Sequence, residues 1–385
     1  MRIAHVSDFY LPRLGGIEMH IHDLASRQQA AGHDVEVITA TPRPASSRGP
    51  VEECGRTVHR LTESAFYPSA LHPAGLPLGR RLIRDGKYDL VHVHIGVVSP
   101  LAFATAHAAA NTALPTVVTV HSMLSYCQPA FKALDVAARW SAWPVVWTAV
   151  SDVAATPIRR LVGRDRPVIV LPNGIDPEEW RVTPAPRDPR EVVVVAVMRL
   201  ASRKRPRHLL RALRRARAQV PASTRLRAVV VGEGPQRPAL ERYLRRHDMA
   251  GWVSLPGRFH RSEIRALFEH ADLFVAPATL ESFGIAALEA RCAGLPVIAR
   301  AQSGVREFVS DGREGILVNS ELDLSDAIAR LAADPTARQE IANHNRAVPP
   351  PVTWEHVLRM TDDAYAAASD LASRPAGPTS VGMAG

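Results

Sequence analysis

Short runs of aliphatic and β-branched residues alternate along this chain with longer amphipathic segments, and this alternation limits the possible folds more than any other feature. In the first half such runs occupy residues 2–9, 35–39, 89–95, 116–121, 145–150 and 169–171. An apolar run of this length predicts a buried strand, and the segments between the runs predict helices that cover both faces of a parallel sheet. The pattern is that of an α/β fold.

A second series of the same kind starts abruptly at Val192, after the proline-rich stretch 181–190. Its strands are expected at 192–198, 226–231, 252–255, 273–276, 296–299 and 316–318. We therefore expect two doubly wound, Rossmann-like domains facing a central cleft, residues 1–183 and 184–350. A C-terminal helix over 351–372 and a disordered tail over 373–385 should follow.

Composition excludes several other classes of protein. A hydrophobic fraction of 46% excludes a disordered chain. The three cysteines lie far apart, which excludes a disulfide scaffold and a cysteine-based zinc site and suits a reducing cytosol. Residues 90–131 carry no formal charge, but three prolines interrupt them, so a membrane span is not expected. No signal peptide is visible, and a cytoplasmic location is expected.

Two cations follow the strand predicted at 192–198. Arg199 lies at the strand end, and Lys204 precedes a helix that Pro206 can open. Such a pair can clamp a diphosphate and stabilise the negative charge of a leaving group. The alternative is an exposed arginine-rich helix face, which we expect for most of 203–217. Because the chain has only three lysines, Lys204 is favoured as functional.

A carboxylate pair provides the strongest signal in the sequence. Glu281 can accept hydrogen bonds from sugar hydroxyls, and Glu289, two turns into the next helix, can bind a ribose. The backbone amides between them can bind hydroxyls or phosphate, and they belong to Ser282, Phe283, Gly284 and Ile285. The alternative is a capped, exposed helix start, but a carboxylate within an apolar run needs a partner.

Two further candidates lie in the first domain. Gly16 opens a helix directly after the first strand, where its amide suits a phosphate or a sugar hydroxyl. The dinucleotide spacing G-x-G-x-x-G is absent there, which argues against a nicotinamide enzyme. His121 ends a strand and can contact the donor sugar or the acceptor, whereas His92 and His94 are expected to be structural. No Cys/His cluster or other metal motif is seen, so no metal is expected.

In their joint order, these motifs resemble glycosyltransferase family 4, the retaining GT-B nucleotide-sugar transferases, over about residues 1–370. The set includes Gly15–Glu18, Asp89–His94, Thr119–His121, Pro172–Asp176, Arg199 with Lys204, Gly232–Pro235 and the pair Glu281 and Glu289. The resemblance implies that the first domain binds the acceptor, the second domain binds the donor, and the last helix returns to the first domain.

The resemblance also assigns roles to single residues. Arg199 and Lys204 match the pyrophosphate clamp, Glu289 the ribose ligand and Glu281 the sugar ligand. His121 matches the histidine near the transferred sugar, Gly16 the amide under the phosphate, and Gly232 belongs to the donor loop. The sequence departs from the family in two places: Arg205 follows Lys204 where a glycine is usual, and 303–307 replaces the usual Gly-Gly-hydrophobic-Pro-Glu segment.

The expected donor is a UDP- or GDP-hexose, transferred with retention and without a metal or cofactor. Arg258 is a candidate for contact with the base. A nucleotide-sugar epimerase or phosphorylase on the same fold is the alternative. Nucleic-acid binding is not expected, because the charge of +9 is spread along the chain without interleaved aromatic residues.

The acceptor is left open among an inositol lipid, a polyol and a glycan. The basic amphipathic segment 76–87, preceded by Phe66 and Tyr67, can contact an anionic membrane at the inner face of the plasma membrane. An ordinary surface helix is the alternative.

Overall fold

The computed structural model describes residues 1–13, 15–43, 50–62, 75–125, 127–163, 166–186 and 188–374. Phe66, Tyr67 and the expected tail from residue 375 lie outside these ranges. The chain divides into two compact units. Unit 1 comprises 1–150, 154–171 and 358–385, and unit 2 comprises 151–153 and 172–357.

Unit 1 is built on an eight-stranded sheet in the order β3-β4-β2-β1-β5-β6-β7-β8. Its parallel strands are β1 (Arg2–Ser7), β2 (Asp34–Thr39), β4 (Arg56–Arg60), β5 (Leu90–Ile95), β6 (Thr116–Val120), β7 (Val146–Ala149) and β8 (Val168–Val170). The register places His5 of β1 opposite His92 of β5. This pairing brings polar residues together in the middle of the sheet.

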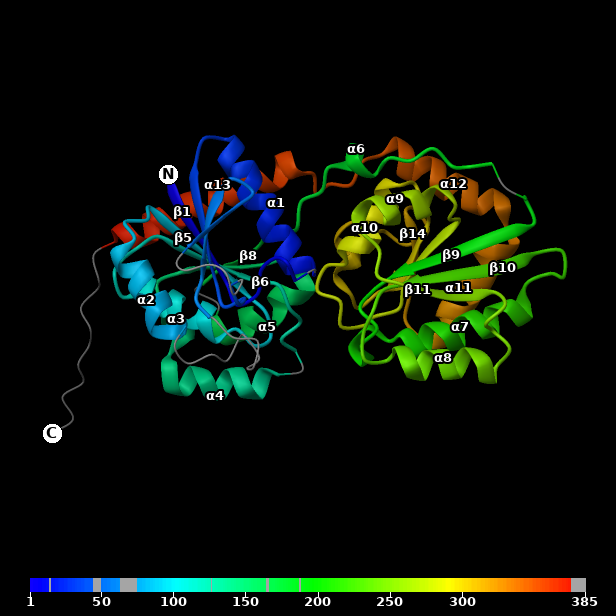
Figure 1. Ribbon diagram of the computed structural model, residues 1–385, viewed down its shortest axis with the longest axis horizontal. Coiled ribbons are helices and arrows are strands. Elements are labelled where there is room, and N and C mark those ends of the chain that lie inside the picture. The colour runs from blue at the N-terminus through cyan, green and yellow to red at the C-terminus, as the bar shows by residue number, and fades with distance from the viewer. Residues whose placement is uncertain are drawn as a thin grey trace. The chain divides into compact units, whose positions relative to one another are not determined.

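Helices cover both faces of this sheet (Figure 1). On one face, α1 (Gly16–Ala30) and α13 (Trp354–Ser373) pack on Ile3, Leu90 and Val117. The other face is covered by α2 (Gly75–Asp85), α3 (Pro100–Ala110), α4 (Gln128–Ala138) and α5 (Asp152–Val162). A short 3₁₀ turn, η2 (Trp140–Ala142), follows α4.

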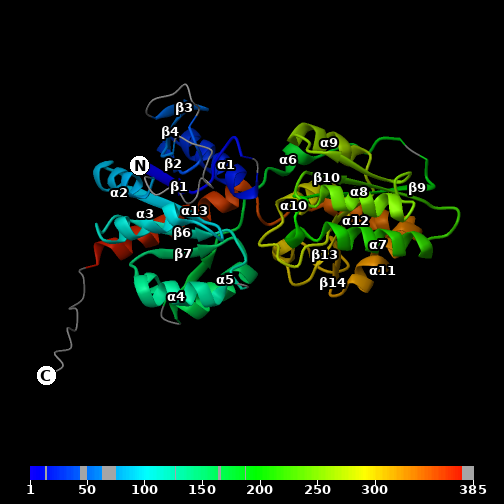
Figure 2. The ribbon, with the colours of Figure 1, turned by 60° about the horizontal axis from the view of Figure 1, so that its bottom comes forward.

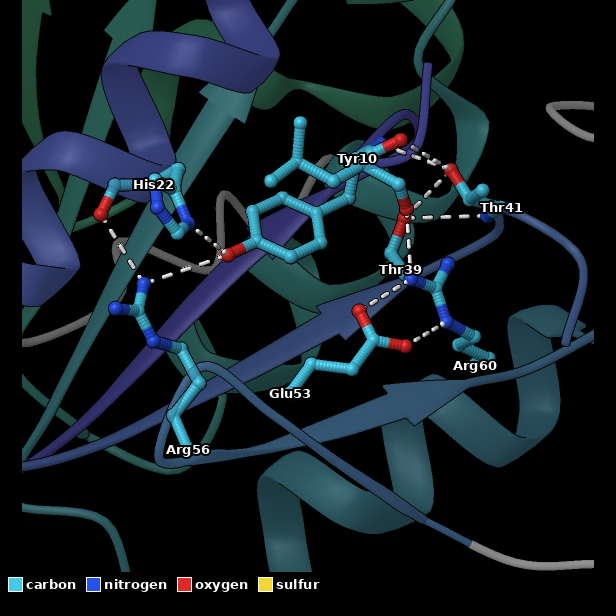
Figure 3. A network of polar contacts seen from close by, with 8 residues as sticks. Tyr10, His22, Thr39, Thr41, Glu53, Arg56 and Arg60 are labelled. Carbon is cyan, nitrogen blue, oxygen red and sulfur yellow. Dashed lines mark hydrogen bonds and ion pairs between the residues drawn. The ribbon is translucent and has the colours of Figure 1, made fainter. Parts of the chain in front are cut away.

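A hairpin of β3 (Val51–Glu53) and β4 forms the edge of the unit 1 sheet (Figure 2), and the sequence analysis did not predict it. Two buried arginines of this hairpin form hydrogen bonds that hold it in place (Figure 3). Arg56 donates to Tyr10 Oη (3.4 Å) and to the carbonyl of His22 (3.1 Å). Arg60 binds both carboxylate oxygens of Glu53 at 2.9 and 2.7 Å. These hydrogen bonds, together with Val58 of β4, which is buried against Tyr10, Ile21 and Val37, therefore stabilise this edge.

Unit 2 has a fully parallel six-stranded sheet in the order β11-β10-β9-β12-β13-β14. The strands are β9 (Glu191–Val197), β10 (Arg225–Val231), β11 (Val253–Gly257), β12 (Leu273–Ala276), β13 (Val297–Arg300) and β14 (Gly315–Val318). Its helices are α6 (Pro177–Trp180), α7 (Pro206–Gln219), α8 (Arg237–Arg246), α9 (Arg261–Glu269), α10 (Ile285–Cys292), α11 (Glu321–Ala333) and α12 (Pro335–Ala347). In Figure 1, α7 and α8 lie on one side of the sheet, and α9 and α10 lie on the other.

The division between the units falls after Leu171, before the proline-rich stretch. That stretch contains no helix or strand among its described residues, and Ala185 donates its amide to the carbonyl of Glu269 (2.8 Å), so it packs with unit 2. From Leu358 onward α13 belongs to unit 1. Within the described ranges, no helix has both the length and the apolar character needed to cross a bilayer.

Candidate active site

The loop after β9 carries two cations at the carboxyl end of the unit 2 sheet. Arg199 is exposed, whereas its neighbour Leu200 is fully buried and donates its amide to the carbonyl of Glu233 (2.9 Å). The 3₁₀ turn η3 (Ser202–Lys204) then places Lys204 just before α7, which Pro206 starts. The buried leucine thus fixes a loop on which Arg199 is exposed and Lys204 is partly buried.

A glycine turn after β10 packs directly against this loop. A Cβ on Gly232, whose φ is +136°, would lie 1.9 Å from the carbonyl oxygen of Met198. A Cβ on Gly234 would lie 2.5 Å from that of Leu200. Only glycine permits this approach. The amide of Gly232 also donates to the carbonyl of Gly257 (2.6 Å). This bond places the next residue, the exposed Arg258, at the same carboxyl edge of the sheet.

The loop after β12 supplies the partner of Lys204. The ammonium of Lys204 lies 2.5 Å from Oε2 of Glu281, and both side chains are about four-fifths buried, with 20% and 18% exposed. The carbonyl of Glu281 accepts the amide of Gly304 (2.8 Å), where the 3₁₀ turn η4 (Gly304–Glu307) begins. The structure therefore joins two residues that the sequence separates by 77 positions.

The start of α10 completes this edge of unit 2. Gly284 precedes the helix with φ +98°, and Phe283 is buried and anchors the turn. Ser282 and Ile285 on either side are half-buried. Glu289 lies in the second turn of α10 and is only 7% exposed. The first amides of an α-helix have no partner within the helix, so they favour an anion here.

Together these loops form an edge suited to a phosphorylated sugar. Arg199, Lys204 and the α10 amides can bind a diphosphate and stabilise negative charge that develops on it. Glu281 and Glu289 can accept hydrogen bonds from hydroxyl groups. All of these residues belong to unit 2.

The two candidates in unit 1 are connected through helix α1. Gly16 is the exposed first residue of α1, and His20, one turn further on, has its ring centroid 5.4 Å from that of His121. His121 follows β6 and is 5% exposed. Burial lowers the pKa of His121 to about 3, so the imidazole is neutral at physiological pH.

His121 is joined to a layer of buried histidines. Its Nε2 lies 3.0 Å from Nδ1 of His94, whose Nε2 lies 2.9 Å from Nδ1 of His5. The sequence analysis interpreted His94 and His92 as structural. It missed their clustering with His5, because the rings come from β1 and β5.

Three of these histidines form a possible metal-binding group. One ring nitrogen from each of His5, His92 and His94 lies within 4.8 Å of the others, and Zn²⁺ binds such sets. However, every ring nitrogen of the three already has a hydrogen-bond partner. A metal would have to displace these bonds, which favours a hydrogen-bonded layer. That no metal is needed stays a prediction.

Comparisons with known proteins agree with this arrangement. A model of "Glycosyltransferase Family 4" matches residues 14–179, and one of "Glycosyl transferases group 1" matches residues 178–348. The glycogen synthase of Mycobacterium tuberculosis is 29% identical over 403 residues, covering 96% of this chain and 95% of the relative. The gpi3 subunit of phosphatidylinositol N-acetylglucosaminyltransferase from Schizosaccharomyces pombe is 25% identical, covering 94% and 79%.

A solved structure with the same fold is HepE of Anabaena in complex with UDP and glucose. Its TM-score is 0.74 at 20% identity, over 95% of this chain and 99% of HepE. Two α/β units, each built on a sheet of mainly parallel strands, define the GT-B fold of glycosyltransferases. The chain belongs to glycosyltransferase family 4, as the two successive family matches across residues 14–348 show.

Proposed function

We propose that this enzyme transfers a hexosyl group from a UDP- or GDP-sugar to a hydroxyl group, with retention of the anomeric configuration. The observation that carries the proposal is the pair of Lys204 and Glu281 beside Arg199 and the start of α10. This arrangement offers cations for a diphosphate and a carboxylate for sugar hydroxyls at one edge. HepE, which has the same fold, binds UDP and glucose.

Each residue then has a distinct role in the reaction. Arg199 and Lys204 neutralise the charge that grows on the leaving diphosphate. Glu281 hydrogen-bonds the sugar, and Glu289 binds the ribose. In unit 1, the roles proposed for Gly16 and His121 are that the amide binds a phosphate and the imidazole a sugar hydroxyl. Gly232 and Arg258 border the donor, Arg258 near the base.

Retention is proposed to proceed by attack on the same face from which the diphosphate leaves. Glu281, the carboxylate expected at the sugar, is held by Lys204 and is not placed as a nucleophile. The donor phosphate then assists deprotonation of the acceptor. NMR of the anomeric proton in the first product should show the configuration of the donor, and inversion would exclude this mechanism.

The same cations make a divalent metal unnecessary for the proposed reaction, since they supply the compensating charge. Activity should therefore survive exhaustive treatment with EDTA. Loss of all turnover, restored by added Mg²⁺ or Mn²⁺, would contradict this.

A donor panel tests the function itself. UDP- and GDP-hexoses are incubated with the enzyme, and release of the free nucleotide is measured with and without candidate acceptors. One donor should release its nucleotide slowly by hydrolysis without acceptor, and faster by sugar transfer when the acceptor is present. An epimerase would instead give a free epimer, and a phosphorylase would need inorganic phosphate, so product analysis distinguishes these alternatives.

The acceptor is proposed to be a lipid-linked, polyol or glycan hydroxyl, and helix α2 offers a route to a lipid. Its Gly79 faces Leu101 of α3, and Ile83 is buried, so the apolar stripe packs inward. The exposed residues of α2 are Pro77, Leu78, Arg80, Arg81, Arg84 and Asp85, and Asp85 pairs with Arg81 at 3.2 Å, which leaves a net positive face. This basic face can bind an anionic leaflet at the inner face of the plasma membrane, each charge contributing about 1 kcal/mol.

Vesicle flotation tests this contact. The wild type should float with anionic but not with neutral vesicles, and replacing Arg80, Arg81 and Arg84 with serine should abolish flotation. A matched control replaces Arg242, Arg245 and Arg246, exposed on α8 of unit 2, with serine. Equal loss in both variants, or no flotation of the wild type at low salt, would indicate a soluble acceptor.

A further inference from the structure

The unit 1 sheet buries a polar layer beneath α1 and α13. His5, His92 and His94 come from the two central strands, Gln28 from α1 and Tyr365 from α13. The rings of His92 and His94 stack with centroids 4.2 Å apart. Hydrogen bonds connect the layer from Tyr365 at one end to His121 at the other.

The amide of Gln28 gives one branch of the layer a fixed direction. Its Oε1 can only accept, so His5 must donate from Nε2 (2.6 Å). Nδ1 of a neutral His5 is then an acceptor and receives the proton of His94 Nε2 (2.9 Å). Nδ1 of His94 in turn accepts from Nε2 of His121 (3.0 Å).

The second branch has a compatible direction. Nε2 of Gln28 donates to Tyr365 Oη (2.9 Å), which leaves the Tyr365 hydroxyl to donate to Nδ1 of His92 (2.9 Å). Nε2 of His92 donates to Thr119 (2.7 Å), Thr119 to Thr148 (2.6 Å), and Thr148 to the carbonyl of Val118 (3.4 Å). The orientation of the Gln28 amide thus satisfies both branches at once.

Burial keeps the rings of the layer neutral. The pKa of His5 falls to about 4, chiefly through burial and partly through the charge of Arg56. Burial also lowers the pKa values of His92 and His94. It has the same effect on His20 of α1, whose ring lies near that of His121. A neutral imidazole has one donor and one acceptor, so the chain of rings has a single direction.

We propose that Gln28, through His5 and His94, fixes the tautomer of His121, with the proton on Nε2 and an unprotonated Nδ1. Within the described part of the chain, no hydrogen bond to Nδ1 of His121 is found. This nitrogen therefore accepts a hydrogen bond from a hydroxyl of the bound sugar or acceptor and disfavours an anionic phosphate oxygen. Gln28, His5 and His94 are positioning residues. The role of His121 at the sugar rests on the proposed function, whereas its tautomer does not.

The tautomer can be measured directly on the full-length protein. With ¹⁵N-labelled histidine, long-range ¹H–¹⁵N correlation spectra distinguish protonated from unprotonated ring nitrogens, and His121→Gln identifies the His121 signals. We expect a protonated Nε2 and an unprotonated Nδ1 at pH 7. A proton on Nδ1 in the wild type would overturn the proposal whether or not the protein transfers sugar.

Variants test the role of Gln28. Gln28→Leu removes the acceptor with little change in volume, so His121 should become a mixture of tautomers. Gln29→Leu is the matched control, because this adjacent side chain donates to the carbonyl of Gly55 instead. If Gln28→Leu does not fold, Tyr365→Phe removes the hydroxyl that orients the Gln28 amide and should also produce a mixture. An unchanged tautomer in the folded variant would refute the proposal.

Kinetics and metal binding complete the test. Once a donor is known, Gln28→Leu should lower kcat about 5- to 10-fold, the range expected for one misdirected hydrogen bond, with the KM of the donor nearly unchanged. An equal effect of Gln29→Leu would contradict the positioning role. Stoichiometric Zn²⁺ bound by the wild type and lost in His5→Gln would replace the hydrogen-bonded layer with a metal site.

Discussion

The central strands of the two units bury different chemistry. In unit 1, β1, β5 and β6 bury His5, His92, His94 and Thr119. In unit 2, the central strands β9 and β12 bury only valine, alanine, leucine and phenylalanine. The polar groups of unit 2 that are candidates for chemistry lie instead in the loops at the strand ends and, for Glu289, in helix α10.

This difference shows two ways to position functional groups on one kind of sheet. In unit 2 an apolar core supports loops whose positions depend on close backbone approaches at Gly232, Gly234 and Gly304. In unit 1 the candidate His121 depends on a hydrogen-bonded layer that reaches through the core. The stability of unit 1 should therefore depend on protonation of its buried histidines. The catalytic rate should depend on the charges in the loops of unit 2.

Acid should destabilise unit 1 more than unit 2, and this difference in stability is the largest effect expected. Five buried histidines of unit 1 have lowered pKa values, whereas His208 and His247 of unit 2 lie nearer the surface. The unfolded chain, with an ordinary histidine pKa of 6.5, binds more protons below that pH, so unit 1 loses stability as the pH falls from about 6.5 to about 4. His5 alone accounts for a loss of order 3 kcal/mol.

Asp8 opposes this trend, because burial raises its pKa to about 7 and it takes up a proton in the folded state. One such group does not balance five histidines. Hydrogen exchange followed by mass spectrometry at pH 7, 5.5 and 4.5 should show unit 1 peptides opening first. Earlier opening of unit 2 would contradict the expected difference between the units.

Loop charge in unit 2 should control catalysis. Lys204→Ala removes the cation that stabilises the leaving diphosphate, so kcat/KM should fall roughly 10²-fold or more, with little change in the acid sensitivity of unit 1. Arg203→Ala, at the exposed neighbouring position, is the control and should be near normal. Near-normal kinetics for Lys204→Ala would assign Lys204 to the exposed arginine-rich face.

The smallest effect concerns the position after Lys204. Arg205 has φ +58°, a left-handed conformation that suits the glycine usual in the family, and it pairs with Glu321 at 2.7 Å. Arg205→Gly relieves about 1 kcal/mol of backbone strain and loses a partly exposed ion pair of similar size. The free energy of unfolding should change by less than about 1 kcal/mol in urea titrations. A loss above about 2 kcal/mol would show that the ion pair holds the loop.

Apart from β4, the parallel strands could be predicted from the sequence because each is a local apolar run, such as that of β9. The residues of the unit 2 edge were also recognisable, since Arg199, Lys204 and Glu281 follow predicted strands. Their pairing was not, because the Lys204–Glu281 contact exists only once β9 and β12 lie side by side.

Two features gave no local signal at all. The β3–β4 hairpin consists of short polar runs, and it depends on Arg56 and Arg60 reaching distant partners. The histidine layer joins residues up to 89 positions apart in one strand pair, and α13 supplies Tyr365 from 273 positions beyond His92. Residue spacing cannot reveal contacts of this kind.

The return of α13 to unit 1 determines when that unit can be completed during synthesis. Unit 2 ends at Val357, so all of its residues leave the ribosome before Tyr365 does. The first 150 residues emerge early, but the hydroxyl that orients Gln28 arrives only with the last helix. The N-terminal unit is therefore the last to reach its native hydrogen bonding, although most of it is made first.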